Sequence, residues 1–238
     1  MFYWLICVSS ASPLLNLVNQ SGQIDYTTHA QTIDHQAWVD SLASVTVPTD
    51  PNTAKAFWIN TYNSLTIHVV LKAYPIQSIR DIDNGKVWDT AQFQIGSEML
   101  TLNDIEHVKL GAFEDPRTHA ALNCASIGCP KLRSTPYSAN TLDIDLNAAS
   151  RDWVAHNAYS YDDGWFSNTL YLNAIFDWYA SDFSTTNSSF RNDHIPEKYI
   201  GAFDFLYRFG DTQTQSKLTK TTNVAMQPYD WSLNAVAP

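Results

Sequence analysis

The chain has 238 residues, of which 45% are hydrophobic and 13% aromatic, so it is long and apolar enough to bury a sizeable core. Wholesale disorder is thereby excluded. Its formal net charge of −10 at pH 7 repels phosphate backbones and anionic lipid, which argues against a nucleic-acid partner and against docking on a membrane surface. No apolar run approaches the roughly 20 residues that a transmembrane helix needs, so no integral membrane segment is expected.

The first twelve residues resemble the end of a secretory signal. Residues 2–8 are mostly apolar and residues 9–12 are small, although no basic stretch precedes them. The alternative is that these apolar side chains cover part of the core. We expect residues 1–12 to be the remnant of a leader and residues 13–238 to form a single domain. The expected location is periplasmic or extracellular, with a cytoplasmic location as the alternative.

Apolar periodicity predicts the first elements of that domain. A short strand is expected at 24–26, and a helix at about 31–43 follows it. The clearest element is a helix at 52–73, because Asp50-Pro51 is typical of a helix start and Pro75 lies just beyond the end. Its narrow polar stripe, which we interpret as a solvated edge, consists of Asn60, Ser64 and His68.

Hairpins and further helices follow. A hairpin is expected at 93–100, with its turn at Gly96-Ser97, and Thr101 and Asp104 are expected to cap a short helix. The later elements are a helix at 138–155, a hairpin around 162–164 ending in 169–172, helices at 173–181 and 196–209, and an edge strand in 224–234. Helices and hairpins interleave without βαβ regularity. This order predicts an α+β fold, a single domain with several helices around a small, mostly antiparallel sheet built from hairpins.

Residues 115–130 are the segment richest in reactive side chains. A nucleophilic cysteine needs a lowered pKa and a base within hydrogen-bonding distance. His119 precedes Cys124 by five residues, which places the two on opposite faces of a strand and about 140° apart on a helix. His107 comes from a different element and is free to face Cys124. We therefore expect a catalytic dyad of Cys124 and His107.

Neighbouring residues would assist such a dyad. Arg117 and His119 would supply positive potential, and Asn123, Ser126 or backbone N–H groups around Cys124 would stabilise an oxyanion. Glu106 adjoins His107, but adjacent helix positions point in different directions. We expect Glu106 to pair with one of three cations, Arg117, Arg151 or Lys109. The candidate catalytic residues are Cys124, His107, His119, Asn123, Arg117 and Glu106.

Other interpretations of the same atoms stay open. Cys124 could be an inert buried thiol. A tetrahedral zinc would accept the side chains of His107, His119, Cys124 and Cys129, although their spacing matches no zinc finger. Cys124 and Cys129 could also form a disulfide across a small loop. The spacing is not C-x-x-C, so a dithiol oxidoreductase is not favoured, and no nucleotide-binding or zincin motif is present.

Several motifs together resemble the domain-of-unknown-function 547 (DUF547) family. They occupy residues 22–26, 56–66, 104–107, 115–130, 175–179 and 229–234, in the order typical of that family. The resemblance implies one α+β domain and a shared cluster of His107, His119, Cys124 and Cys129. It also implies that many bacterial relatives are exported and that some relatives carry the domain beside a glutaredoxin-like domain. It implies no particular reaction, and it does not choose among nucleophile, metal ligand and disulfide.

Two functional hypotheses follow. The first is a cysteine-nucleophile hydrolase or transferase that acts on an amide, ester or thioester bond of a peptide or small-molecule substrate, with no cofactor and no metal. The second is a non-catalytic exported binding module in which Cys124 and Cys129 form a disulfide or bind zinc. Its aromatic-rich surface would then contact a peptide or glycan.

Overall fold

The structure, a computed structural model, describes residues 12–32, 34–165, 167–184 and 194–236. These residues form two compact units, which are described separately. Unit 1 contains the described residues of 1–113, 132–142 and 233–238, and unit 2 contains those of 114–131 and 143–232. The predicted leader remnant lies outside the described residues, except for Ser12. The prediction of a single domain over 13–238 stays a prediction.

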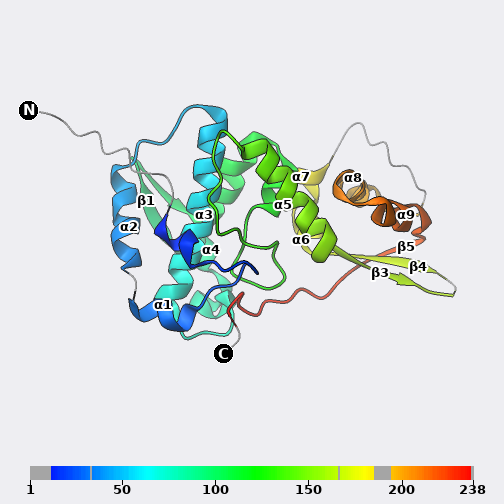
Figure 1. Ribbon diagram of the computed structural model, residues 1–238, viewed down its shortest axis with the longest axis horizontal. Helices are drawn as coiled ribbons and strands as arrows, with labels where there is room; N and C mark the ends of the chain where they lie inside the picture. The colour runs from blue at the N-terminus through cyan, green and yellow to red at the C-terminus, as the bar shows by residue number, and fades with distance from the viewer. Residues whose placement is uncertain (1–11, 33, 166, 185–193, 237–238) are drawn as a thin grey trace, which may run out of the picture. The chain divides into compact units, whose positions relative to one another are not determined.

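Unit 1 is organised around one long buried helix (Figure 1). The helices and strands of this unit are α1 (Tyr26–Thr32), α2 (His35–Ser41), α3 (Pro51–Ala73), α4 (Val87–Thr90), β1 (Gln92–Ile95) and β2 (Glu98–Thr101). β1 and β2 form an antiparallel hairpin, which confirms the hairpin predicted at 93–100. Thr101 and Asp104 exchange backbone-to-side-chain hydrogen bonds of 2.9 and 3.1 Å at the start of a short helix, Asp104–Leu110, as predicted.

The sequence signals around α3 correctly predict its limits. The Asp50 carboxylate accepts a 2.9 Å hydrogen bond from the N–H of Thr53, and Pro51 occupies the first turn. The predicted solvated edge is wrong, because Asn60, Ser64 and His68 are all buried. The Asn60 side chain instead bonds both backbone groups of Tyr137, at 2.8 and 2.9 Å. A polar stripe can thus satisfy backbone groups inside a core, where no water reaches them.

The prediction for the segment before α3 is wrong in two details. Residues 25 and 26 do not continue a strand, because α1 begins at Tyr26 and only Ile24 makes isolated β-bridges. The helix expected at 31–43 begins only at His35. The reason is a cap: the Asp34 side chain accepts a 3.1 Å hydrogen bond from the N–H of Ala37.

Two histidines pair inside unit 1. The Nδ1 atoms of His35 on α2 and His68 on α3 lie 2.8 Å apart, so one ring donates and the other accepts. Burial, more than any nearby charge, lowers the pKa of both imidazoles, and the pKa of His68 falls to about 4. Both rings are therefore neutral at pH 7, and the shared hydrogen bond requires the accepting Nδ1 to carry no proton.

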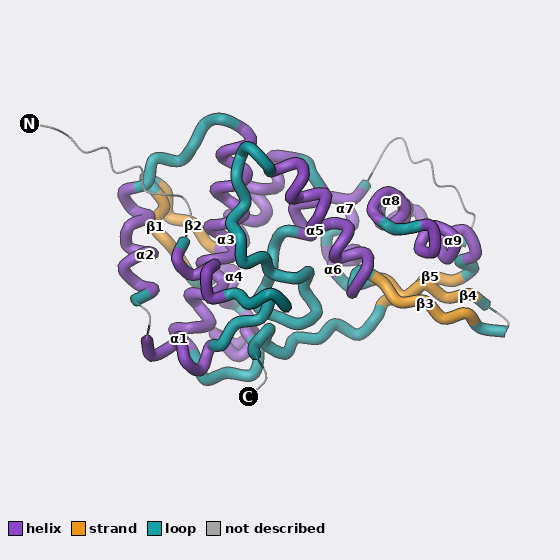
Figure 2. Tube along the Cα trace, in the orientation of Figure 1, coloured by secondary structure: helices purple, strands orange, loops and turns teal. Residues whose placement is uncertain are grey.

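Unit 2 combines a three-stranded sheet with helices. Its elements are α5 (Leu142–His156), β3 (Tyr159–Asp163), β4 (Asn168–Leu172), α6 (Ile175–Trp178), α7 (Ala180–Phe183), α8 (Ile200–Phe209), α9 (Thr212–Lys220) and β5 (Asn223–Met226). Figure 2 shows the three strands side by side, with β3–β4 antiparallel and β4–β5 parallel. The second hairpin and the tail strand are confirmed, although the strand covers only 223–226. The core contains the stacked rings of Trp153 and Phe176, whose centroids lie 4.7 Å apart.

The fold is α+β, as the sequence predicts. It differs in having two small sheets, one in each unit, and in splitting the helix expected at 173–181 into α6 and α7. The helix predicted from 138 begins at Leu142. Within the described part of the chain, no helix is both long enough and apolar enough to span a bilayer.

Candidate functional site

The chemically richest segment, 115–130, belongs entirely to unit 2. It begins with a short 3-10 helix, Pro116–Ala120, because the Asp115 side chain accepts a 3.1 Å hydrogen bond from the N–H of Arg117 and Pro116 fits the first turn. The chain then continues as the loop 123–130, which contains both cysteines of interest.

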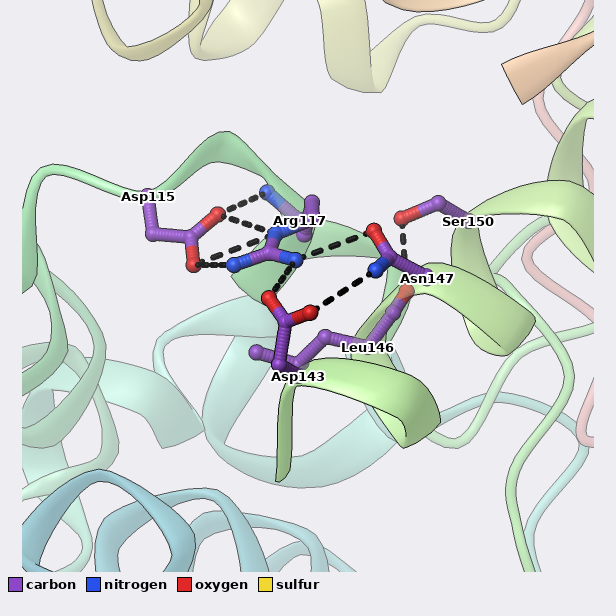
Figure 3. Close-up of polar contacts among 6 residues, drawn as sticks. All are labelled: Asp115, Arg117, Asp143, Leu146, Asn147 and Ser150. Atoms are coloured by element: carbon purple, nitrogen blue, oxygen red, sulfur yellow. Dashed lines mark hydrogen bonds and ion pairs between the residues drawn. The ribbon is translucent and has the colours of Figure 1, made fainter. Parts of the chain in front are cut away.

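Arg117 is held by three acceptors, which Figure 3 shows around its guanidinium group. Its Nη2 lies 2.7 Å from Asp115, and its Nη1 lies 2.6 Å from Asp143 and 3.0 Å from the amide oxygen of Asn147. The side chains of Arg117 and Asp115 are each only 16% exposed. These bonds raise the pKa of Arg117 and lower that of Asp143. Arg117 therefore ties the start of this segment to α5.

His119 forms its hydrogen bond with a residue of α7. Its Nε2 lies 2.9 Å from the Asp182 carboxylate, and its ring packs against Tyr179 and Phe183 at centroid distances of 4.3 and 5.3 Å. The imidazole is buried among these groups. The contacts describe a packed, hydrogen-bonded histidine, which ties the 3-10 helix to α7.

Cys124 and Cys129 are joined in a disulfide, with 6.2 Å between their Cα atoms. Cys129 is buried and Cys124 is half-buried. The Tyr229 hydroxyl lies 3.1 Å from the Cys124 sulfur and 3.0 Å from the Cys129 sulfur, and the Ser126 hydroxyl lies 3.2 Å from Cys124. Of the interpretations left open by the sequence, the structure contains the disulfide. That bond takes both of the thiolates that a zinc site would need.

Asn123 stabilises the same loop from within. Its side-chain oxygen accepts the N–H of Ala125 at 2.8 Å, and its amide nitrogen donates to the carbonyl of Pro130 at 2.8 Å. Ala125 has φ of 58°, in the left-handed region that few residues other than glycine adopt. The Asn123 amide, which was predicted to serve an oxyanion, is used here to close a strained turn.

The loop is also bonded to the tail of unit 2. The N–H groups of Ile127 and Gly128 donate to the carbonyls of Ser232 and Asp230, at 2.9 and 2.8 Å. A Cβ atom on Gly128 would lie 2.8 Å from the Tyr229 ring, so only glycine permits this approach. The disulfide loop therefore fixes the position of Tyr229.

Tyr229 belongs to an aromatic cluster, which we define as Trp178, Tyr229 and Trp231. Ring centroids lie 4.8 Å apart for Trp178 and Tyr229, 4.6 Å for Tyr229 and Trp231, and 5.5 Å for the two tryptophans. Trp178 is 49% exposed. None of the three is among the predicted catalytic residues, although the family-like motifs at 175–179 and 229–234 contain all of them.

Glu106 and His107 lie in unit 1, on the helix Asp104–Leu110. Glu106 is buried and His107 is exposed. The pairing predicted between Glu106 and Lys109 is not found, and the pairings with Arg117 and Arg151, which belong to unit 2, stay predictions. Lys109 pairs with Glu98 at 2.7 Å, and Arg117 has the partners described above. Because His107 and Cys124 belong to different units, the dyad stays a prediction.

A metal site was the other alternative. Across the described ranges, no group of three or more His, Cys, Asp or Glu side chains is arranged to hold a metal ion.

Comparison with known proteins identifies one family. The model of the family described as protein of unknown function, DUF547, matches residues 48–154, which contain α3, the short helix at 104–110 and the disulfide loop. No curated protein and no solved structure matches the chain. Over residues 48–154, this match supports the DUF547 assignment that the sequence motifs predict.

Proposed function

We propose that the chain is a non-catalytic binding module, and that its aromatic cluster receives cationic side chains of a peptide. The observation that carries this proposal is the half-exposed indole of Trp178, which lies within 5.5 Å of the rings of Tyr229 and Trp231. Aromatic clusters with an exposed face are uncommon on surfaces without a binding role.

The charges around the cluster favour a cationic ligand. Asp230 lies between Tyr229 and Trp231 in the sequence, and the whole chain carries a net charge of −10, whereas Asp177 beside Trp178 is already paired with Lys198 at 2.6 Å. An arginine or lysine over an indole face gains about 0.5–1 kcal/mol at exposed sites, and nearby carboxylates add attraction. An acidic peptide would be repelled by the same groups.

The disulfide loop 123–130 supports binding because it holds the aromatic cluster in place. The disulfide, the Asn123 hydrogen bonds and the close approach of Gly128 all restrict Tyr229. A surface that is ordered before binding loses less conformational entropy when a ligand arrives. A disulfide also persists best in an oxidising compartment, so we propose that the module is exported.

A fluorescence titration tests this function. Acetyl-tetraarginine amide is expected to change the tryptophan fluorescence of the native protein saturably. Trp178→Ala is expected to raise the Kd about fivefold, which corresponds to the loss of one cation–π contact. Trp165→Ala is the matched control, since Trp165 is 94% exposed and lies outside the cluster. Both variants keep the net charge unchanged, so nonspecific attraction of a polycation is the same in all three proteins.

Two outcomes would contradict the proposal. Equal Kd values for the native protein and Trp178→Ala would show that the peptide binds only through the general negative charge. Saturable binding of chitohexaose without binding of the arginine peptide would show that the ligand is a glycan and not a peptide.

A second candidate is the cysteine nucleophile, which requires the reduced form of the pair. The observation in its favour is that the hydroxyls of Tyr229 and Ser126 lie within 3.2 Å of the Cys124 sulfur. Two such donors would stabilise a thiolate at Cys124 and lower its pKa. Iodoacetamide labelling of Cys124 and Cys129 in the native protein separates this candidate from the first.

A further inference from the structure

A second feature of unit 2 is a pocket of about 560 Å³, a size usual for small-molecule sites. Four elements contribute to it, namely α5, β3, the end of α8 and the first two turns of α9, together with the turn between α8 and α9. Its lining includes three cationic side chains, those of Arg151, Arg208 and Lys217, and one carboxylate, that of Asp211. The lining thus carries a charge of about +2, in a chain whose net charge is −10.

These cations differ from others in the chain. Arg117, Lys109 and Lys198 each form an ion pair of 2.6–2.8 Å. Within the ranges that the structure describes, none of the three pocket cations has a carboxylate at ion-pair distance. Asp211, the acidic residue of the lining, caps α9 by accepting the N–H of Thr214 at 2.7 Å. Its pKa is lowered mainly by this cap and also by the charge of Lys217, so Asp211 offsets part of the positive charge of the lining, as the sum of about +2 already counts.

Aromatic rings orient two of these cations. The Lys217 ammonium lies 5.7 Å from the ring centroid of Tyr159, and the Arg208 guanidinium lies 5.1 Å from that of Phe209. Both rings line the pocket, and so does Tyr161, whose buried hydroxyl has no hydrogen-bond partner among the described residues. The pocket thus combines flat apolar walls with positive charge, and a bound acceptor could satisfy the Tyr161 hydroxyl.

We propose that this pocket binds a phosphate monoester of a small aromatic or otherwise flat alcohol. A phosphate monoester carries about −1.5 to −2 charges at pH 7, which matches the charge of the lining better than a single carboxylate does. Arginine guanidinium groups bond phosphate oxygens in pairs, and lysine adds a point charge. The aromatic walls would pack against the organic part.

Calorimetric titration with phenyl phosphate tests the proposal. The native protein is expected to bind it saturably, and Lys217→Gln and Arg208→Gln are each expected to raise the Kd about tenfold, as the loss of a charge-assisted contact implies. Lys220→Gln is the matched control, because Lys220 is an exposed lysine on the same helix, outside the pocket. Its Kd is expected to stay within about twofold of the native value.

Four results would overturn the proposal. The first is the absence of saturable binding at millimolar phenyl phosphate. The second is an equal rise of the Kd in Lys217→Gln and Lys220→Gln, which would show that phenyl phosphate responds only to the overall positive charge of this helix. The third is inorganic phosphate binding as tightly as phenyl phosphate, which would show that the aromatic group of the ligand does not contribute to its affinity. The fourth is tighter binding of benzoate, which would make the ligand a carboxylate.

Discussion

Replacing Arg117 by methionine is expected to lower the free energy of unfolding by about 3 kcal/mol. The change leaves the Asp115 carboxylate, which is only 16% exposed, without its counter-charge. Removing one partner of a largely buried pair is costly because the other charge stays desolvated. The bonds to Asp143 and Asn147 are lost as well, although Asp143 is exposed and contributes less. Urea unfolding followed by circular dichroism gives the value.

A double variant separates two contributions to this loss of stability: the unpaired charge of Asp115 and the lost packing of the Arg117 side chain. Asp115→Asn keeps an oxygen that can accept the N–H of residue 117, so the helix cap is retained while the charge is removed. Arg117→Met with Asp115→Asn is expected to recover at least about 1 kcal/mol relative to Arg117→Met alone. If Arg117→Met unfolds at the same urea concentration as the native protein, the network is not structural.

The second large effect concerns pH and the His35–His68 pair. The folded state holds the pKa of His68 near 4, whereas an unfolded histidine titrates near 6.5. Between these values the unfolded state binds more protons, so the free energy of unfolding rises with pH across this window. Stability is therefore lost as pH falls from about 6.5 toward 4. Lys72 beside the pair acts in the same direction, while Asp34 and Asp40 oppose it.

We expect the free energy of unfolding to fall by about 2 kcal/mol more in the native protein than in His68→Gln between pH 7 and pH 4.5. Urea unfolding at both pH values measures the difference. His156→Gln is the control, because the side chain of His156 is 72% exposed, and it should behave like the native protein. Equal pH dependence in the native protein and His68→Gln would mean that the buried pair does not control acid stability.

Elements with local signals were the predictable part of the fold. α3 could be located because Asp50-Pro51 and Pro75 mark its ends and apolar residues fill it. In contrast, α9 contains almost no apolar periodicity. It forms because Asp211 caps it and Leu218 is buried against unit 2. Such a helix depends on tertiary packing, which the local sequence does not show.

The site could be predicted only in part, for a related reason. The disulfide joins cysteines five residues apart and was among the alternatives left open. The partners of Arg117 and His119 lie farther along the chain: Asp143 is 26 residues from Arg117, and Asp182 is 63 residues from His119. Spacing rules for helices and strands cover only near neighbours, so they cannot identify these contacts.

The aromatic cluster shows the same limit. Trp178 ends α6, whereas Tyr229 and Trp231 come from the tail beyond β5, and the loop 123–130 brings the tail into place. The sequence shows that the tail is rich in aromatic residues but not which side chain completes the cluster. Only the tertiary structure places Trp178 beside it.

The proposed binding surface depends on the disulfide between Cys124 and Cys129. Iodoacetamide labelling with peptide mapping tests it on native protein, on denatured unreduced protein and on protein reduced before denaturation. We expect that neither cysteine labels in the first two samples and that both label in the third; the denatured sample distinguishes a disulfide from buried thiols. Fast labelling of Cys124 in the native, unreduced protein well below pH 8.5, the usual thiol pKa, would rule out the disulfide and favour an activated nucleophile.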